Sequence, residues 1–267
     1  MARLTALITG ASSGIGAAFA RRLAAEGHDL VLTARSMAPM EQLAEQLRQA
    51  HGVRVEVLGQ DLAQPDAARQ LTRELDERGL TVDLLVNNAG FGTCGRFEEI
   101  SAERDHDQVM VNVVALTDLT HALVPRMLSR GGGAVVNVAS TAGFQPAAYF
   151  AVYSAAKAYV LNFSLALWSE YRDRGLKVLA LCPGPVETQF FEVIGTRKAA
   201  VNGRMVTADL VVDKALQALK RNRGYVVPGL SNFAGAHLQP RRPRKLLALV
   251  SRMVTRGVLT TPATGRV

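Results

Sequence analysis

Tyr153 and Lys157 are the two side chains of this 267-residue chain whose types and spacing best suit acid–base chemistry. Because they are four positions apart, a helix would place them on one face, one turn from each other. A nearby ammonium group stabilises tyrosinate and lowers a phenol pKa that is ordinarily about 10. Such a phenol can donate a proton to a carbonyl oxygen or take one from an alcohol. The alternative is an ordinary pair on a helix surface.

The segment from Gly10 to Gly16, GASSGIG, is compatible with two kinds of site. Its first five residues fit G-x-S-x-G, the turn that exposes a nucleophilic serine in hydrolases, here Ser12. The whole segment is also a glycine-rich turn that can cradle a phosphate at the start of a helix. A hydrolase nucleophile follows several strands, whereas this turn follows the first, and the late histidine, His237, lies beside a basic tail. We favour the phosphate site and keep a serine hydrolase using Ser12 as an alternative.

Short apolar runs, each followed by a segment with helical periodicity, determine where these residues lie in the fold. The predicted strands cover residues 4–8, 29–34, 53–58, 82–86, 133–139, 177–182 and 225–227. The predicted helices cover residues 14–26, 39–50, 65–78, 101–128, 152–173 and 208–222. This alternation predicts βαβ units with right-handed crossovers. The expected fold is therefore α/β, a Rossmann-type doubly wound parallel sheet of about seven strands with helices on both faces.

Composition and cysteine content exclude several classes of protein. A hydrophobic content of 48% with only 10 prolines is typical of a globular chain and not of a disordered one. Cys94 and Cys182 lack metal-ligand spacing, so neither a disulfide framework nor a bound metal is expected. The N-terminal apolar run is too short for a signal peptide, and no apolar stretch is long enough to span a bilayer. We expect a cytoplasmic protein.

A series of motifs follows the predicted elements in order, and with it the chain resembles the short-chain dehydrogenase/reductase family. The segment Thr9-Gly10-Ala11-Ser12-Ser13-Gly14-Ile15-Gly16 is similar to the family's T-G-x-x-x-G-I-G turn. The motifs that follow are Asp61-Leu62, Asn87-Asn88-Ala89-Gly90, Asn112, Ser140, Tyr153-Ser154-Ala155-Ala156-Lys157, and Pro183-Gly184 with Thr188. Each motif alone is a weak signal, but their order on the expected elements makes coincidence very improbable. The resemblance covers roughly residues 4–228.

The resemblance implies an oxidoreductase that interconverts a carbonyl and a secondary alcohol by hydride transfer. It implies that Tyr153 is the general acid/base, that Lys157 lowers its pKa, and that Ser140 holds the substrate carbonyl. Asn112 would kink its helix and support a proton relay through water to Lys157, with a satisfied amide in the core as the alternative. The four residues together argue against a second hypothesis, a cofactor-binding regulatory or scaffold protein on the same fold.

The expected cofactor is NADP(H). Its expected binding residues come from the motifs and from the end of the second strand: Gly10, Ser12, Ser13, Gly14, Ile15, Gly16, Arg35, Asp61, Leu62, Asn88, Ala89, Gly90, Tyr153, Lys157, Pro183, Gly184, Val186 and Thr188. NADP(H) is preferred because the second strand ends without the acid that binds the ribose hydroxyls of NAD. Arg35, at that place, can make a charge-assisted contact with a 2′-phosphate, although a solvated surface arginine is the alternative.

Aromatic side chains near two loops favour an apolar substrate, although plain packing is their commoner role. The predicted substrate-binding residues are Ser140, Tyr153, Phe144, Phe190 and Phe191. We expect a hydrophobic ketone, a ketosteroid or an acyl chain, without a choice among them. The long irregular segment 183–206 is expected to be a lid or a binding segment. As partners we expect further copies of the chain, in a homodimer or homotetramer, and no nucleic acid.

The formal net charge of +8 is concentrated at the C-terminus. Residues 240–267 carry seven basic and no acidic side chains, which leaves +1 for the rest of the chain. The expected domains are residues 1–230, which bind the dinucleotide and carry the catalytic groups, and residues 231–267, a basic amphipathic extension. The extension is expected to dock on its own domain or on a neighbouring subunit. Peripheral contact with anionic lipid is the second alternative, and nucleic acid the last, because no recognition motif accompanies the charge.

Overall fold

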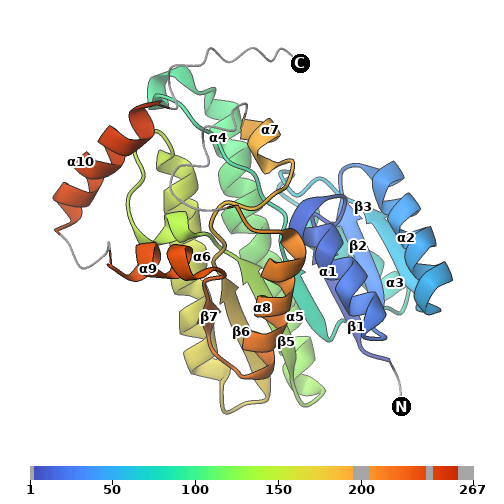
Figure 1. Cartoon of the computed structure of the whole chain (residues 1–267). Helices are drawn as coiled ribbons and strands as arrows, with labels where there is room; N and C mark the ends of the chain where they lie inside the picture. The colour runs from blue at the N-terminus through green and yellow to red at the C-terminus, as the bar shows by residue number, and fades with distance from the viewer. Residues whose placement is uncertain (1–2, 195–204, 239–242, 258–267) are drawn as a thin grey trace.

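A computed structural model describes residues 3–194, 205–238 and 243–257 of the chain, without the side chains of Phe191 and Val193. In this part of the chain, seven parallel strands form a single sheet in the order β3-β2-β1-β4-β5-β6-β7 (Figure 1). The strands are β1 (Thr5–Thr9), β2 (Asp29–Ala34), β3 (Val55–Gly59), β4 (Leu84–Asn87), β5 (Gly133–Val138), β6 (Leu176–Leu181) and β7 (Tyr225–Val226). The predicted fold class is confirmed.

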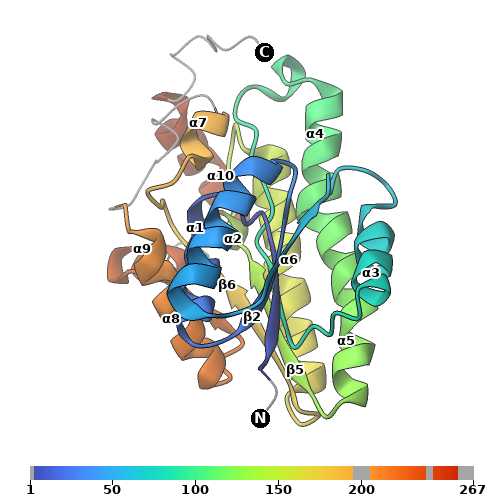
Figure 2. The ribbon, with the colours of Figure 1, turned by 90° about the vertical axis from the view of Figure 1, so that its right-hand side faces the viewer.

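Helices cover both faces of the sheet, as its apolar strands require. Figure 2 shows α1 (Gly14–Ala25), α2 (Met37–His51) and α8 (Ala208–Lys220) on one side, and α3 (Ala67–Glu77) and α5 (Leu116–Ser129) on the other. The long helix α6 (Ala151–Tyr171) packs against β6 on the same face as α5. In β1, Ala6, Leu7 and Ile8 are all fully buried, because successive side chains enter the cores on opposite faces.

The strand boundaries predicted from the apolar runs agree with the structure to within two residues. The predicted helix 101–128 differs, because it is divided into α4 (Ala102–Val109), a π-helical turn η2 (Met110–Ala115) and α5. Asn112 lies inside η2, where its side chain bonds to the backbone of Phe91. A long-range contact therefore accompanies the irregular turn, and helical periodicity alone does not reveal it.

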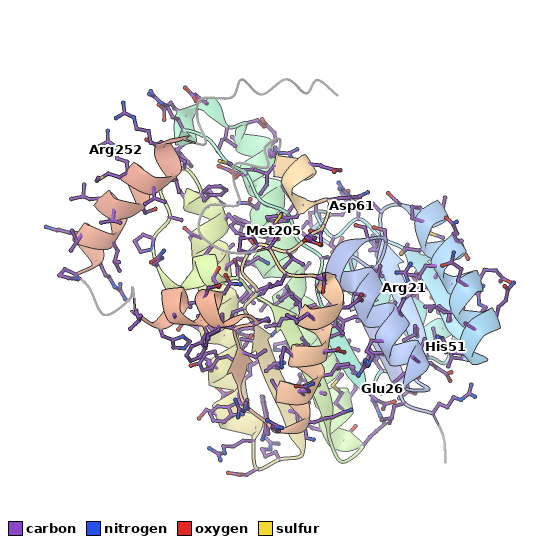
Figure 3. The ribbon with its side chains drawn as sticks, viewed as in Figure 1. Arg21, Glu26, His51, Asp61, Met205 and Arg252 are labelled. Carbon is purple, nitrogen blue, oxygen red and sulfur yellow. The ribbon has the colours of Figure 1, made fainter. Side chains whose placement is uncertain are left out.

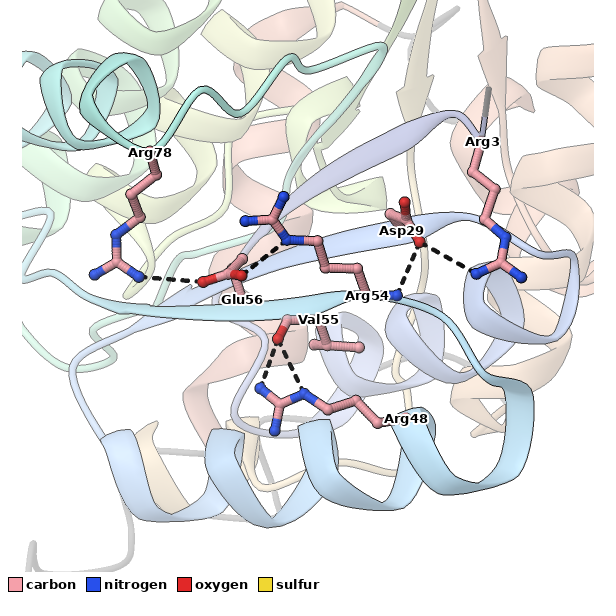
Figure 4. Close-up of polar contacts among 7 residues, drawn as sticks. All are labelled: Arg3, Asp29, Arg48, Arg54, Val55, Glu56 and Arg78. Carbon is pink, nitrogen blue, oxygen red and sulfur yellow. Dashed lines mark hydrogen bonds and ion pairs between the residues drawn. The ribbon is translucent and has the colours of Figure 1, made fainter. Parts of the chain in front are cut away.

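The outer strand β3 is held at the edge of the sheet by arginine side chains (Figure 4). The guanidinium of Arg48 donates from Nε and Nη2 to the carbonyl oxygen of Val55, at 3.2 and 2.5 Å. Glu56 accepts from Arg54 at 2.9 Å and from Arg78 at 3.2 Å. Burial acts to raise the pKa of Glu56, but the hydrogen bonds and charges of the two arginines outweigh it and lower this pKa. Charged side chains along an exposed edge also disfavour pairing with another chain.

Two helices follow the last strand, α9 (Leu230–Leu238) and α10 (Arg244–Thr255), at the left of Figure 1. Helix α10 contacts its own domain at Ala148, whose N–H donates to Ser251 Oγ at 2.9 Å. Thr255 Oγ1 in turn donates to the carbonyl oxygen of Ala148 at 3.1 Å. Of the alternatives for the extension, the structure shows docking on the chain's own domain. None of the helices in the described ranges combines the length and apolar character needed to cross a bilayer.

Candidate active site

The sheet opens a large cleft at the carboxyl ends of its strands, where the crossovers from β1 and β4 leave in opposite directions. The cleft has a volume of about 1590 Å³ and collects the turns after β1, β2, β3, β4, β5 and β6. All the predicted cofactor-binding residues except Gly16 line it: Gly10, Ser12, Ser13, Gly14, Ile15, Arg35, Asp61, Leu62, Asn88, Ala89, Gly90, Tyr153, Lys157, Pro183, Gly184, Val186 and Thr188. Residues from six separate motifs thus share one cavity.

The glycine turn after β1 needs glycine for two physical reasons. Gly10 and Gly14 have φ angles of 65° and 56°, in the left-handed region that other residues adopt at a cost. A Cβ on Gly16 would collide with the carbonyl oxygen of Gly10, so Gly16 lies beneath the turn and does not line the cleft. In the structure Gly16 permits close packing of the turn, and its contact with the cofactor stays a prediction.

The start of α1 fits a phosphate group. Ser13 occupies the N-cap position without a side-chain hydrogen bond to the helix, so its hydroxyl leaves the N–H groups of the first turn uncapped. The turn is fixed from below by Asn88, whose Nδ2 donates to the carbonyl oxygens of Thr9 and Gly10 at 2.9 and 3.1 Å. The positive end of α1 therefore faces the cleft with its donors available.

The hydrolase alternative requires a histidine near Ser12, and the structure does not bring His237 there. His237 lies 2.8 Å from the Tyr225 hydroxyl through Nε2 and 2.8 Å from the carbonyl oxygen of Phe233 through Nδ1. It is not among the residues that line the cleft. The described part of the chain thus offers no support for a serine hydrolase built on Ser12.

Ser140, Tyr153 and Lys157 meet where the end of β5 packs against α6. The 3₁₀ turn η3 (Thr141–Phe144) follows Ser140 directly, and a Cβ on its Gly143 would lie 2.6 Å from the Lys157 carbonyl oxygen. Glycine at this position therefore permits the two segments to touch. The Ser140 side chain is close enough to the Tyr153 phenol to lower its pKa. Lys157 Nζ donates to the carbonyl oxygen of Val138 at 2.8 Å and lies 5.8 Å from the centre of the Tyr153 ring.

Burial shifts the two pKa values in opposite directions. It raises the pKa of Tyr153 to about 12, and the Ser140 side chain is the neighbour that opposes this rise. It lowers the pKa of Lys157 to about 8, with the Cys182 thiol opposing the shift. The sequence predicts that Lys157 lowers the pKa of Tyr153. The Lys157 ammonium lies 5.8 Å from the centre of the Tyr153 ring and donates to the Val138 carbonyl, and its effect on the Tyr153 pKa stays a prediction.

Asn112 lies beside the cleft but does not line it. Its Oδ1 accepts from the Phe91 N–H at 3.2 Å, and its Nδ2 donates to the Phe91 carbonyl oxygen at 2.9 Å. A Cβ on Gly90 would lie 2.5 Å from Asn112 Oδ1 and 3.4 Å from Lys157 Nζ, so Gly90 separates these two groups. The amide of Asn112 is thus satisfied by backbone, and its place in a proton relay stays a prediction.

The three phenylalanines that the sequence predicts to bind substrate lie in different surroundings. Phe190, at the start of α7 (Phe190–Ile194), lines the cleft with its ring centre 5.6 Å from that of Tyr153. Phe144 does not line the cleft: η3 places its ring against Tyr225 and His237, at centre distances of 6.4 and 5.6 Å. The geometry gives no support to its contact with substrate, which stays a prediction. The side chain of Phe191 lies outside the described residues, as does most of the segment 195–206.

Sequence reasoning missed a buried polar network beneath the site. Asn87 Nδ2 donates to Asn137 Oδ1 at 2.9 Å and to Thr120 Oγ1 at 3.0 Å. Asn137 Nδ2 donates to Ser164 Oγ at 3.0 Å, which ties β5 to α6. Asn87 directly precedes Asn88, and Asn137 directly precedes Val138, the acceptor of the Lys157 bond. Polar residues inside apolar strands were the signal for this network.

Comparison with known proteins agrees with this geometry. Residues 4–199 match the family model for short chain dehydrogenase. The chain is 37% identical over 186 residues to sulfoacetaldehyde reductase 2 of Chromohalobacter salexigens, covering 69% of this chain and 73% of that protein. It is similar to the structure of a short-chain dehydrogenase from Sphingobium yanoikuyae in complex with NADPH, with a TM-score of 0.80, 34% identity and 98% of each chain covered. A bulky-bulky ketone specific alcohol dehydrogenase from Comamonas testosteroni gives a TM-score of 0.75 and 31% identity, covering 98% of this chain and 97% of that one.

Proposed function

Because the chain belongs to the short-chain dehydrogenase/reductase family and is an oxidoreductase, we propose that it reduces a bulky apolar ketone to a secondary alcohol with NADPH, and catalyses the reverse reaction. The observation that carries this proposal is that Ser140 and Tyr153 line the same cleft, where the Ser140 side chain acts to lower the pKa of Tyr153, with buried Lys157 one helical turn from Tyr153.

In the proposed mechanism, Ser140 and Tyr153 bind the carbonyl oxygen of the substrate through their hydroxyl groups. NADPH, when bound, supplies the hydride that reaches the carbonyl carbon. As negative charge develops on the oxygen, Tyr153 Oη transfers its proton to that oxygen, and Ser140 continues to donate a hydrogen bond. Lys157, below its pKa of about 8, carries the positive charge that stabilises the tyrosinate left behind. Asn112 holds the Phe91 backbone beside these groups and supports the proton relay from Lys157.

The proposed preference for NADP(H) rests on Arg35, at the end of β2. Arg35 is exposed, lines the cleft, and has no hydrogen-bond or ion-pair partner among the residues that the structure describes. A guanidinium group without a partner suits a phosphate ester better than the hydroxyl groups of an unmodified ribose. The Sphingobium structure with NADPH supports the same choice.

The proposed substrate class rests on the side chains near Tyr153. Phe150, Phe190 and Ile194 line the cleft, so the carbonyl would be bound in largely apolar surroundings. The bulky-ketone specificity of the Comamonas enzyme supports a substrate of that kind.

A screen for NADPH oxidation across three carbonyl classes tests this function: bulky ketones, ketosteroids and β-ketoacyl thioesters. We expect oxidation with bulky ketones, with one secondary alcohol formed for each NADPH consumed. Purified protein that binds NADPH but oxidises it with none of these substrates would contradict the proposed reaction.

A further inference from the structure

The cleft continues past Ser140 and Tyr153 to the C-terminal helix α10. Four apolar side chains of this helix line the cleft, namely Leu246, Leu247, Val250 and Val254. They lie outside residues 4–199, the part of the chain that matches the family model. The far wall of the cleft is therefore supplied by the extension.

Helix α10 is attached next to the segment that carries Tyr153. Leu247, Ser251 and Thr255 share the inner face of the helix, where Leu247 is 9% exposed and Thr255 is 8% exposed. The Ser251 and Thr255 hydroxyls bond to the N–H and the carbonyl of Ala148, three residues before the start of α6. Since both polar groups of one peptide residue are satisfied by α10, the wall has a defined position relative to Tyr153.

The wall presents apolar surface to the cleft. Leu246, Val250 and Val254 are 45%, 46% and 41% exposed although they face the cavity, so about half of each remains for a ligand to cover. The basic residues of α10 do not line the cleft, and Arg252 projects from the helix away from the sheet (Figure 3). The chemistry of this wall therefore suits uncharged, apolar groups.

The volume of the cleft leaves room for such a group. A typical small-molecule site has roughly 300–1,000 Å³, whereas this cleft has about 1590 Å³. The glycine turn follows β1 and Arg35 follows β2, and these strands lie on the right of Figure 1, whereas α10 lies on its left. Because all three segments line the cleft, a dinucleotide bound at the glycine turn leaves the part beside α10 free.

We infer that α10 is the distal wall of the substrate site, where Leu246, Val250 and Val254 contact the apolar part of the ketone and limit its size. This inference rests on the proposed function, because it takes the carbonyl to lie at Ser140 and Tyr153. It adds specificity-determining residues from the extension: a larger side chain at Val250 shortens the substrates that fit.

Val250→Trp tests the inference, with Met253→Trp as the matched control on the same helix. Met253 is 78% exposed and does not line the cleft, so tryptophan there changes only the outer surface. We expect Val250→Trp to lower kcat/KM for a diaryl ketone roughly tenfold or more, and to change that for a small methyl ketone by less than about twofold. Met253→Trp should leave both values unchanged. Equal effects of the two substitutions on the diaryl ketone would overturn the inference.

A binding measurement separates this inference from the proposed reaction. Calorimetric titration of the diaryl ketone into the Tyr153→Phe protein saturated with NADPH measures binding without turnover. Adding Val250→Trp should weaken binding roughly tenfold, and adding Met253→Trp should not. If Val250→Trp alone weakens binding but the wild-type protein reduces no ketone, the proposed reaction is wrong and the role of α10 in binding is supported. If the wild-type protein reduces the ketone and neither tryptophan substitution affects binding, the proposed reaction is supported and the inference that α10 contacts the substrate is wrong.

Discussion

At the scale of single residues, burial decides which group of the site holds a proton. Tyr153, with its pKa raised to about 12, keeps its proton throughout the neutral range. Lys157, with its pKa lowered to about 8, is still charged at pH 7 but loses that charge at a mildly alkaline pH. Before cofactor binds, the protein therefore holds the protonation state that reduction of a carbonyl requires, a proton to give and a charge to stabilise the resulting anion.

These pKa values predict how the reduction depends on pH. We expect kcat/KM for ketone reduction to be constant below about pH 7 and to fall as pH rises through about 8. Lys157 has its pKa below the ordinary value, so its charged form is lost over this range, while Tyr153 stays protonated to about 12. A pH profile of kcat/KM measures the transition. A profile that stays flat until the phenol itself titrates would contradict the assignment to Lys157.

A second prediction at this scale concerns Arg35. Arg35→Ala should raise the KM for NADPH about tenfold or more, because a charge-assisted contact with the 2′-phosphate is lost. The KM for NADH should change little, since that cofactor carries no such phosphate. Steady-state kinetics with both cofactors make the comparison, and Arg35→Lys serves as a control that keeps the charge. Equal changes for the two cofactors would argue against a phosphate contact.

At the scale of elements, the sequence predicts strands well and their irregular connections poorly. Parallel strands buried on both faces must be short apolar runs, so their positions could be predicted closely, as β1 and β5 show. The family resemblance predicts a kink at Asn112, but helical periodicity does not reveal the π-helical turn there, because the amide bonds that accompany it connect to Phe91, 21 residues away. The packing of Phe144 on Tyr225 and His237 has the same origin: segments far apart in sequence decide which way an aromatic ring points.

The contact between η3 and α6 gives a prediction for these elements. Gly143→Ala places a Cβ 2.6 Å from the carbonyl oxygen of Lys157, and this backbone atom cannot move aside without shifting α6. Because η3 follows Ser140 directly, we expect Ser140 to be displaced from Tyr153 and kcat to fall about a hundredfold. Kinetics together with thermal unfolding measure both effects.

Gly257→Ala is the matched control, since its Cβ would meet nothing within 4 Å. It should leave kcat and the unfolding temperature unchanged. A Gly143→Ala protein with the activity of wild type would show that the close approach of η3 and α6 does not position Ser140.

At the scale of the whole molecule, the extension is where sequence reasoning reached its limit. Its amphipathic pattern favours docking on its own domain or on a neighbouring subunit but is also compatible with lipid, because each of these covers an apolar face. The hydrogen bond between Ser251 and Ala148, which are 103 residues apart, shows that α10 docks on its own domain. The polar side chain of Ser251 points inward, whereas the apolar side chain of Met253 is 78% exposed. The apolar side chains of α10 are divided among the contact with its own domain, the wall of the cleft and the outer surface.

The most direct test of the account is NADPH consumption in the presence of a bulky ketone, comparing wild type with Tyr153→Phe. The substitution removes only the hydroxyl group that gives the proton, so we expect turnover to fall about 10²–10⁴-fold while NADPH binding, measured by fluorescence titration, is unchanged. Turnover close to that of the wild type in Tyr153→Phe would contradict the central claim that this phenol is the acid of a ketone reductase.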